Sequence, residues 1–177
     1  MGFTYDYPRP AVTVDAALFT PGPRGSLRVL LIRRKHPPFR GRWALPGGFV
    51  DEHEDLEAAM RRELREETSL EVGPLHQLGA YGRPGRDPRG HTVSVVFLGA
   101  VAPEVVPVAG DDAADSRWHP ARRPPLLAFD HALILRDARR ELARLAADPV
   151  AFGRALFASR HRRGAAALCT AAGGPGR

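Results

Sequence analysis

The sequence predicts an α/β domain built on one mixed β-sheet with helices on both faces. Four segments of strand length carry apolar residues, either in alternation with polar ones or in nearly continuous runs. One segment with helical periodicity lies between the second and third strand segments, and another follows the last strand signals. Strands and helices that are mixed along the chain in this way are typical of a sheet with both faces covered.

The N-terminal third of the chain predicts two strands. Residues 27–34 (LRVLLIRR) are apolar throughout their centre, which indicates a strand buried on both faces. Proline and glycine at 21–25 predict the turn before this strand, and two prolines shape a loop at 36–42. A tight turn is expected at Pro46, Gly47 and Gly48. Residues 9–20 alternate as in a strand with one buried face, through Val12, Val14, Ala16 and Leu18.

The next predicted element is an amphipathic helix that starts near Asp55. At about 100° per residue, Glu63 and Glu67 lie in the middle of the apolar arc, and Glu66 lies at its margin. Arg61 and Arg65 point the other way. The apolar arc itself is formed by Leu56, Ala59, Met60 and Leu64.

The carboxylates on this arc are unusual, because carboxylates are seldom buried unless they are paired or bind a metal. A solvated acidic helix with Glu–Arg pairs one turn apart would explain Arg61 and Arg65, but it does not explain Glu63 and Glu67. Magnesium takes oxygen ligands and usually shares its coordination sphere with substrate phosphates. The helix therefore predicts a site for a hard cation.

Beyond this helix the chain predicts further strands and a second helix. Strands are expected at 75–81 and 92–101, with a loop at 82–90 between them, a loop at 103–115 and a short strand at 117–119. Asp130 is the expected N-cap of the second helix, and Pro149 is expected to end it. A short helix is possible at 152–158. Residues 1–149 are predicted to form one domain, and residues 150–177 a basic Ala/Gly-rich tail that is partly disordered.

The stretch from Gly48 to Leu70 resembles the signature of Nudix hydrolases. That signature reads Gly, five residues, Glu, seven residues, then Arg-Glu-apolar-x-Glu-Glu-x-Gly-apolar. The chain matches it at every charged position, with Gly48, Glu54 and the run RELREE at 62–67. It departs only at Ser69, where the family has glycine. Glycine adopts the left-handed conformation of a helix C-terminus most readily, so serine is expected to cost stability there rather than to remove a ligand.

The resemblance implies a metal-dependent hydrolase with a Nudix-type α/β/α sandwich in residues 1–149. The implied cofactor is Mg²⁺, with Mn²⁺ as an alternative. Glu54 and Arg62 would pair and fix the loop against the helix. Glu66 is the first candidate for the general base, and Asp111 or Asp112 of a later loop is the alternative. The implied metal ligands are Glu63, Glu66, Glu67 and the carbonyl of Gly47, and the implied catalytic residues are Glu66, Glu63, Arg62 and Glu54.

The substrate class rests on three further segments, RWALPGGFVD, YGRPGRDPRGHTVSVVFLG and LLAFDHALIL. Together they resemble the ADP-ribose pyrophosphatase branch over residues 11–145, which implies cleavage of ADP-ribose to AMP and ribose 5-phosphate. Hydrolysis of a nucleoside triphosphate or a sugar nucleotide is one alternative. A non-catalytic ADP-ribose sensor, related to Nudix transcriptional regulators, is an alternative from a different class.

Four residues are candidates for substrate binding. Arg86 and Arg89 lie in the loop at 82–90, and a planar guanidinium suits phosphate recognition. An ordinary surface turn shaped by proline and glycine is the alternative for this loop. Gly48 and Phe49, in the glycine turn, are the other two candidates.

Composition limits the partners and the location. The formal net charge is +6, but the segment after Asp148 carries arginines and no acid, so the rest of the chain is close to neutral. That distribution argues against a nucleic-acid partner and leaves a nucleoside diphosphate as the expected one. No apolar run has membrane-spanning length, and a single cysteine, Cys169, predicts a cytoplasmic protein. A homodimer is expected from the resemblance alone.

Overall fold

The computed structural model describes residues 4–103, 105–110, 113–157 and 162–173. Its sheet follows the order β3-β2-β1-β6-β5, while β4 pairs with β1 and β7 pairs with β2. β1 and β6 are parallel and the other pairs are antiparallel, so the predicted mixed sheet is confirmed. The strands are β1 (Ala11–Pro21), β2 (Leu27–Arg34), β3 (Trp43–Ala44), β4 (Gly47–Phe49), β5 (Leu75–Tyr81), β6 (Thr92–Ala100) and β7 (Ala113–Pro120).

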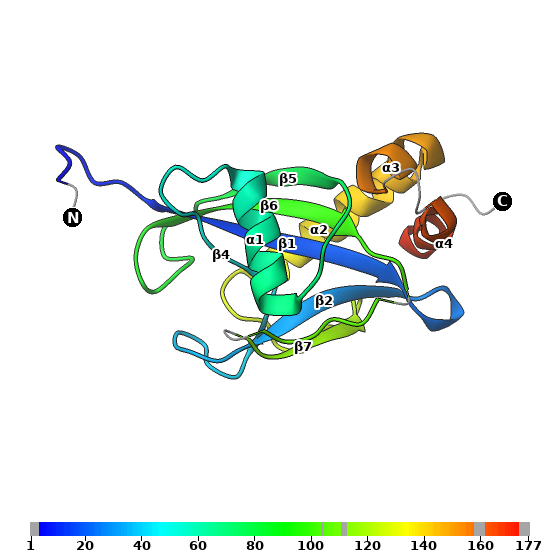
Figure 1. Ribbon diagram of the computed structural model, residues 1–177, viewed down its shortest axis with the longest axis horizontal. Helices are drawn as coiled ribbons and strands as arrows, with labels where there is room; N and C mark the ends of the chain where they lie inside the picture. Colours follow the sequence, from blue (N-terminus) through cyan, green and yellow to red (C-terminus); the bar gives the residue numbers. More distant parts are fainter. Residues whose placement is uncertain (1–3, 104, 111–112, 158–161, 174–177) are drawn as a thin grey trace.

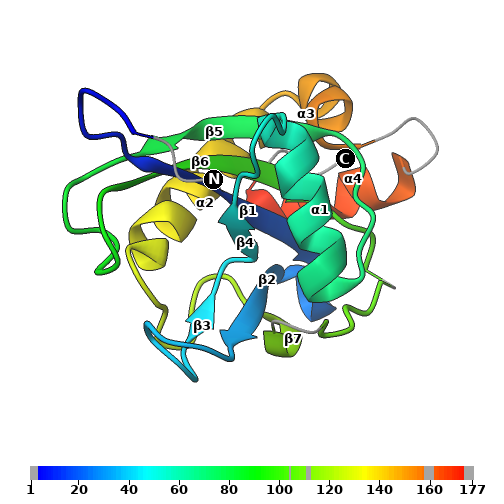
Figure 2. The ribbon, with the colours of Figure 1, turned by 60° about the vertical axis from the view of Figure 1, so that its left-hand side comes forward.

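Helices cover both faces of this sheet (Figure 1, Figure 2). They are α1 (Leu56–Thr68), α2 (His131–Ala146), α3 (Pro149–Leu156) and α4 (Arg162–Ala172), and a short 3-10 turn, η1 (Pro23–Gly25), joins β1 to β2. Alternate residues of β1 divide the core between two clusters. Val14, Ala16 and Leu18 pack toward α1, and Ala17 and Phe19 pack toward α2, α3 and α4. The α/β/α arrangement is therefore confirmed.

Both ends of α1 lie where the sequence predicts them. The Asp55 carboxylate accepts hydrogen bonds from the amides of Glu57 and Ala58, at 2.9 and 3.3 Å, which satisfies two of the free N–H groups at the helix start. Ser69 ends the helix in the left-handed conformation, with φ 56° and ψ 24°. The expected cost of serine at this position therefore has its structural cause, because a residue with a Cβ is strained there.

The second helix begins where the sequence predicts but ends earlier. Asp130 stands at the N-cap of α2 but makes no capping hydrogen bond, because its carboxylate binds Arg86. The C-terminal end lies at Ala146, before Pro149. Pro149 begins α3, where its missing N–H costs nothing, and Asp148 caps that helix.

Two stretches of the predicted tail are helical, and the first of them, α3, overlaps the short helix expected at 152–158. Phe152 and Leu156 of α3 and Leu168 of α4 are completely buried, and Cys169 is buried beside Leu168. All four belong to the core cluster on the α2 face of the sheet. Alanine has the highest helix propensity, so an Ala-rich run with a few larger apolar residues can form a packed helix. Within the described ranges, none of the helices is both long and apolar enough to cross a membrane.

Candidate active site

The chain bends at Leu45 and Pro46 between β3 and β4, whereas Gly47 and Gly48, which the sequence predicts in the turn, begin strand β4 because they pair with β1. Residues 45–48 are called the glycine turn below, and this segment is held from three directions. The amide of Leu45 donates to Nδ1 of His131 at 2.9 Å. The carbonyl of Pro46 accepts from the amide of Ala16 on β1 at 2.9 Å. The amide of Gly47 donates to Oε2 of Glu67 on α1 at 2.8 Å. The turn is therefore fixed between α1, β1 and the start of α2, in the region that Figure 2 shows around β4.

The two glycines of the turn are required for close contact. In the β1–β4 ladder Gly47 lies opposite Asp15, and a Cβ on Gly47 would lie 2.1 Å from the carbonyl oxygen of Val14. A Cβ on Gly48 would lie 2.4 Å from Oε1 of Glu63. The backbone of the turn thus lies directly against β1 and against a carboxylate of α1.

Glu67 is a buried carboxylate without an ionic partner. It is 7% exposed, and among the described residues no Lys, Arg or His side chain pairs with it. Burial raises its pKa from 4.5 to about 8, against the opposing effect of the Gly47 hydrogen bond, and the charges of Glu63 and Asp15 raise it further. Burial also raises the pKa of Glu63. Both carboxylates face inward, as the helical wheel predicts.

Arg62 connects the loop after β4 to the carboxylates of α1. Its guanidinium makes two hydrogen bonds to Glu54, at 2.9 and 2.8 Å, so the expected pair is present. It also donates to Glu63 at 2.8 Å, to Glu66 at 3.2 Å and to the carbonyl of Phe49 at 2.9 Å. These bonds, that to Glu54 above all, raise the pKa of Arg62, and the same bond lowers the pKa of Glu54. Arg62 thus aligns three glutamates and the turn.

The carboxylates fit a divalent cation in chemistry but are turned to protein partners in this structure. No three acidic, histidine or cysteine side chains of the described residues converge as a set of metal ligands. Glu63 and Glu66 accept hydrogen bonds from Arg62, and Glu67 accepts one from Gly47. A hard cation nevertheless requires a buried carboxylate that pairs with no basic side chain, and Glu67 is such a group among the described residues. Gly47 and Gly48 have no side chains, so a cation could approach the backbone beside Glu67 closely. Glu66 differs from the other two, since its side chain is 57% exposed.

A pocket beside the glycine turn brings several predicted substrate residues together. Gly47, Gly48, Arg86 and Arg89 line it, with residues of β1, β2 and the start of α2. Phe49 lies at the same side, where its ring packs 4.8 Å from the Arg89 guanidinium. The loop at 82–90 therefore reaches the site, as its position before β6 suggests.

The two arginines of that loop differ in solvent exposure. Arg86 is 5% exposed in its side chain, makes two hydrogen bonds to Asp130 at 2.9 and 2.7 Å, and lies 3.9 Å from Asp15. Asp130 takes two of its five N–H donors, as Asp87 does for Arg89, so the two arginines differ in exposure rather than in free donors. Arg89 pairs with Asp87 at 2.7 Å and is partly exposed, between the rings of Phe49 and Phe129. Arg89 is thus the better placed of the two for a ligand.

The sequence did not assign several residues of this pocket to the site, among them Asp15, Arg34, Phe129 and His131. Arg34 is partly buried, and burial, followed by the Arg89 charge, lowers its pKa. Asp15 is buried and accepts a hydrogen bond from the Ser94 hydroxyl. A charged residue inside the apolar strand β1 could have indicated Asp15, but no local pattern indicates Arg34, Phe129 or His131. The loop candidates Asp111 and Asp112 lie outside the described residues.

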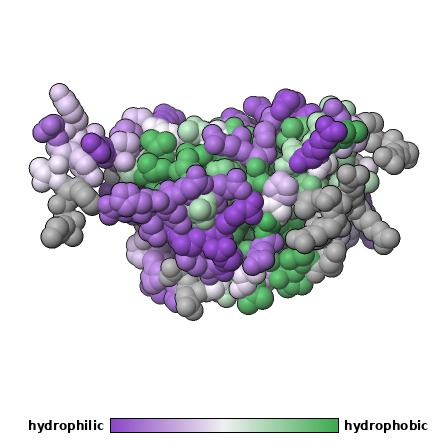
Figure 3. All heavy atoms as spheres, turned by 45° about the horizontal axis from the view of Figure 1, so that its top comes forward, coloured by the Kyte–Doolittle hydropathy of each residue, from purple (hydrophilic) through white to green (hydrophobic). Residues whose placement is uncertain are grey.

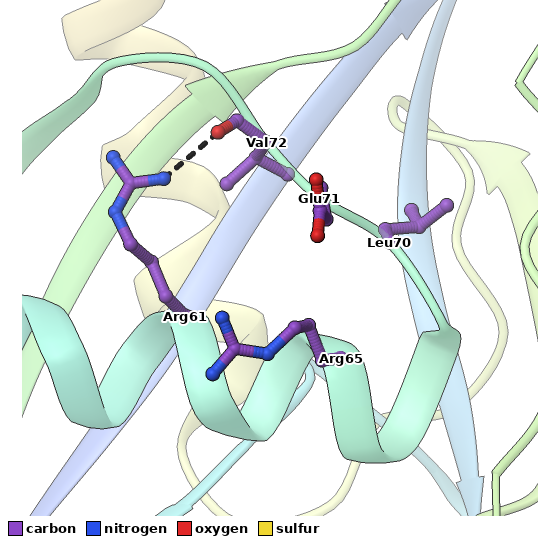
Figure 4. Close-up of a pocket in the computed structure, with 5 residues that line it drawn as sticks. All are labelled: Arg61, Arg65, Leu70, Glu71 and Val72. Atoms are coloured by element: carbon purple, nitrogen blue, oxygen red, sulfur yellow. Dashed lines mark hydrogen bonds between the residues drawn. The ribbon is translucent and has the colours of Figure 1, made fainter.

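A larger cavity, of about 230 Å³, lies on the other side of α1 (Figure 4). Arg61 and Arg65 line it, together with residues 70–72, and Arg61 is tied down by a 2.8 Å hydrogen bond to the carbonyl of Val72. None of the predicted site residues borders it. Figure 3 shows that hydrophilic residues cover most of the visible face, with apolar residues in separate patches. The smaller pocket, beside the carboxylates, is the better candidate.

Known families, relatives and solved structures match about three quarters of the chain. The family model for the NUDIX domain matches residues 9–142. An ADP-ribose pyrophosphatase of Methanocaldococcus jannaschii is 44% identical over 135 residues, which is 76% of each chain. The ADPR responsive transcriptional repressor NtrR of Acinetobacter baylyi is 37% identical over 75% of this chain but only 54% of its own length. The NUDIX domain of Shewanella oneidensis NrtR, solved in complex with ADP ribose, superposes with a TM-score of 0.70 at 36% identity and covers 78% of this chain and 94% of that domain.

Proposed function

The chain belongs to the NUDIX domain family, and from this premise we propose that it hydrolyses ADP-ribose to AMP and ribose 5-phosphate. The observation that carries the proposal is the 44% identity to an ADP-ribose pyrophosphatase over three quarters of both chains. The intact set of Glu54, Arg62, Glu63, Glu66 and Glu67 around the glycine turn supports it, because this is the set that the hydrolytic signature requires.

The carboxylates of α1 and the glycine turn are the proposed cation site. Glu63, Glu66, Glu67 and the carbonyl of Gly47 would hold Mg²⁺ or Mn²⁺. A bound divalent cation of this kind polarises phosphoryl oxygens and lowers the pKa of a coordinated water. Glu67 pairs with no Lys, Arg or His side chain among the described residues, so a bound cation would favour its ionised form over the protonated form that burial favours. Arg62 pairs with Glu63 and Glu66 and keeps them on the same side of the helix.

Proton transfer is assigned to Glu66. Its carboxylate is largely exposed, so it can take a proton from the attacking water and release it to solvent. The water adds to one phosphorus and the P–O–P bridge breaks. Arg89 is the proposed contact for the diphosphate, because its exposed guanidinium lines the pocket together with Gly48 and lies over the ring of Phe49. Arg86 is assigned a supporting role, since its side chain is buried and holds Asp130 through two hydrogen bonds.

A sensor is the second candidate, favoured by the similarity to a repressor that responds to ADPR. This chain covers about half of that repressor's length, and the likeness lies in the part that resembles a solved NUDIX domain with ADP ribose. Both candidates bind the same ligand, so binding cannot separate them, but turnover can. The homodimer and the cytoplasmic location stay predictions.

A substrate panel tests the proposal. Purified protein is incubated with ADP-ribose, a nucleoside triphosphate and a sugar nucleotide, each with Mg²⁺ or Mn²⁺, and the products are separated by chromatography. ADP-ribose should give AMP and ribose 5-phosphate with the highest kcat/KM. Arg89→Gln should raise the KM for ADP-ribose about tenfold, as expected for loss of a charge-assisted hydrogen bond, whereas the exposed Arg83→Gln in the same loop should not. Tight binding of ADP-ribose without turnover would favour the sensor.

A further inference from the structure

The amide of Leu45 depends on a side chain for its hydrogen bond. Leu45 is buried between the end of β3 and the start of β4, and its N–H donates to Nδ1 of His131, which lies 86 residues further along the chain. The next residue, Pro46, has no N–H to offer. A buried amide that loses its acceptor costs free energy, so the turn is held in place by this imidazole.

The hydrogen bond also fixes where His131 carries its proton. Nδ1 accepts from an amide, so a neutral ring must be protonated at Nε2. The ring is 3% exposed, and burial lowers the pKa of His131, which keeps the ring neutral. Nε2 lies 3.5 Å from Oδ1 of Asp15. Both ring nitrogens thus face groups of the site rather than solvent.

The partner of the second nitrogen lies on β1, the strand that pairs with the same turn. Asp15 is opposite Gly47 in the β1–β4 ladder, and its other oxygen accepts from the Ser94 hydroxyl. His131 therefore touches the turn at Leu45 and the strand that lies beneath Gly47. From the opposite direction, Glu67 holds the amide of Gly47. The turn lies between a carboxylate of α1 and an imidazole of α2.

We propose that His131 is a positioning residue, which sets the place of the Gly47–Gly48 turn relative to Glu63 and Glu67 and thereby the geometry in which these groups meet a divalent cation. The inference rests on the proposed metal-dependent hydrolysis. Its physical basis is that displacement of the turn moves the Gly47 carbonyl, the Gly47 amide on Glu67 and the contact of Gly48 with Glu63 at the same time. The rival explanation is that the ring only fills space in the core.

Two variants separate these explanations. In His131→Asn, the amide oxygen stands near the position of Nδ1 and can accept from Leu45, but the ring volume is lost. In His131→Leu, the volume is kept but there is no acceptor. If His131 positions the turn, Asn should keep Mn²⁺ affinity and kcat within about threefold of the parent, while Leu should lose about tenfold or more in both, with a smaller change in KM. If the ring only packs, Leu should resemble the parent and Asn should be the poorer variant, which would overturn the proposal.

Mn²⁺ affinity is measured without substrate, so the test does not depend on ADP-ribose being the substrate. Loss of Mn²⁺ affinity in Leu but not in Asn supports the proposal even in a protein that leaves ADP-ribose intact. Equal affinities in the two variants overturn it. His36→Leu, which changes an exposed histidine of the loop between β2 and β3, is the matched control and should leave affinity and kcat unchanged.

A measurement on the unaltered chain guards against variants that fail to fold. Nitrogen NMR of the His131 imidazole should show an unprotonated Nδ1 and a protonated Nε2. A coupling across the hydrogen bond should join Nδ1 to the amide nitrogen of Leu45. A proton on Nδ1 would be incompatible with the bond and would overturn the proposal.

Discussion

The two glycines of the turn face neighbours of opposite character. A Cβ on Gly47 would meet the carbonyl oxygen of Val14, part of the central strand β1, at 2.1 Å. A Cβ on Gly48 would meet the Glu63 carboxylate, the free end of a flexible side chain, at 2.4 Å. The first neighbour cannot move without distorting the sheet, whereas the second can rotate away. A side chain at Gly47 would therefore disturb the sheet, whereas a side chain at Gly48 would mainly displace a carboxylate of the site.

Substitution by alanine should separate these two roles. Gly47→Ala should lower the melting temperature clearly, since inserting atoms into a tightly packed backbone contact costs about 1–3 kcal/mol. Gly48→Ala should melt near the parent but lose Mn²⁺ affinity and kcat, because Glu63 is pushed out of the site. Thermal unfolding followed by circular dichroism and Mn²⁺ binding by titration check both variants. A Gly48→Ala protein with full Mn²⁺ affinity would remove Glu63 from the proposed cation site.

Single residues were predictable where their signal is local. The inward direction of Glu63 and Glu67 follows from helical spacing alone, and it holds in the structure. Arg86 shows the limit, because its partner Asp130 lies 44 residues away and no local pattern joins them. The same limit applies to His131, whose contact with Leu45 exists only after β3 and α2 have come together.

Helices and strands, like single residues, were predictable where their sequence signal is local. β2 and β5 have the bounds expected from their apolar patterns. β7 is longer than the predicted short strand, because its polar residues are held by pairing with β2, which is distant in sequence. The Ala/Gly-rich composition of α4 hides the fact that Leu168 packs against the sheet.

The contribution of α4 to stability can be measured directly. Leu168 is completely buried, so Leu168→Ala should reduce the free energy of unfolding by about 2–5 kcal/mol. Thr170→Ala changes an exposed residue of the same helix and should have little effect. Below its melting temperature the Leu168→Ala protein should keep its kcat, because α4 and α1 cover opposite faces of the sheet. Denaturant unfolding supplies the free energies. Equal stability of the two variants would mean that α4 is not part of the folded core in solution.

At the scale of the whole molecule, the buried carboxylates couple stability to pH and to metal. Burial raises the pKa of Glu67 from 4.5 to about 8, so the folded, metal-free chain holds its proton more tightly than the unfolded chain does. That stabilisation is complete below about pH 4.5 and is lost as pH rises through 8. His131 has the opposite effect, because burial lowers its pKa, so its contribution to stability falls as pH drops below its ordinary value of 6.5. A comparison with a Glu67 variant separates the contribution of Glu67 to the pH dependence from that of His131.

The melting temperatures of Glu67→Gln and of the metal-free parent should therefore be closer at pH 5 than at pH 8. As pH rises, the variant should become the more stable of the two relative to its position at pH 5, because glutamine has no charge to bury. Excess Mg²⁺ or Mn²⁺ should reverse the order at pH 8. A cation that binds only the folded state raises its stability, and it binds the ionised carboxylate of the parent more strongly than the amide of the variant. The same substitution should lower kcat about a hundredfold, through loss of charge at the proposed cation site. Melting temperatures from pH 5 to 8, with and without metal, test the coupling. If the pH dependence and metal response of parent and variant coincide, Glu67 neither holds the proton nor binds the cation.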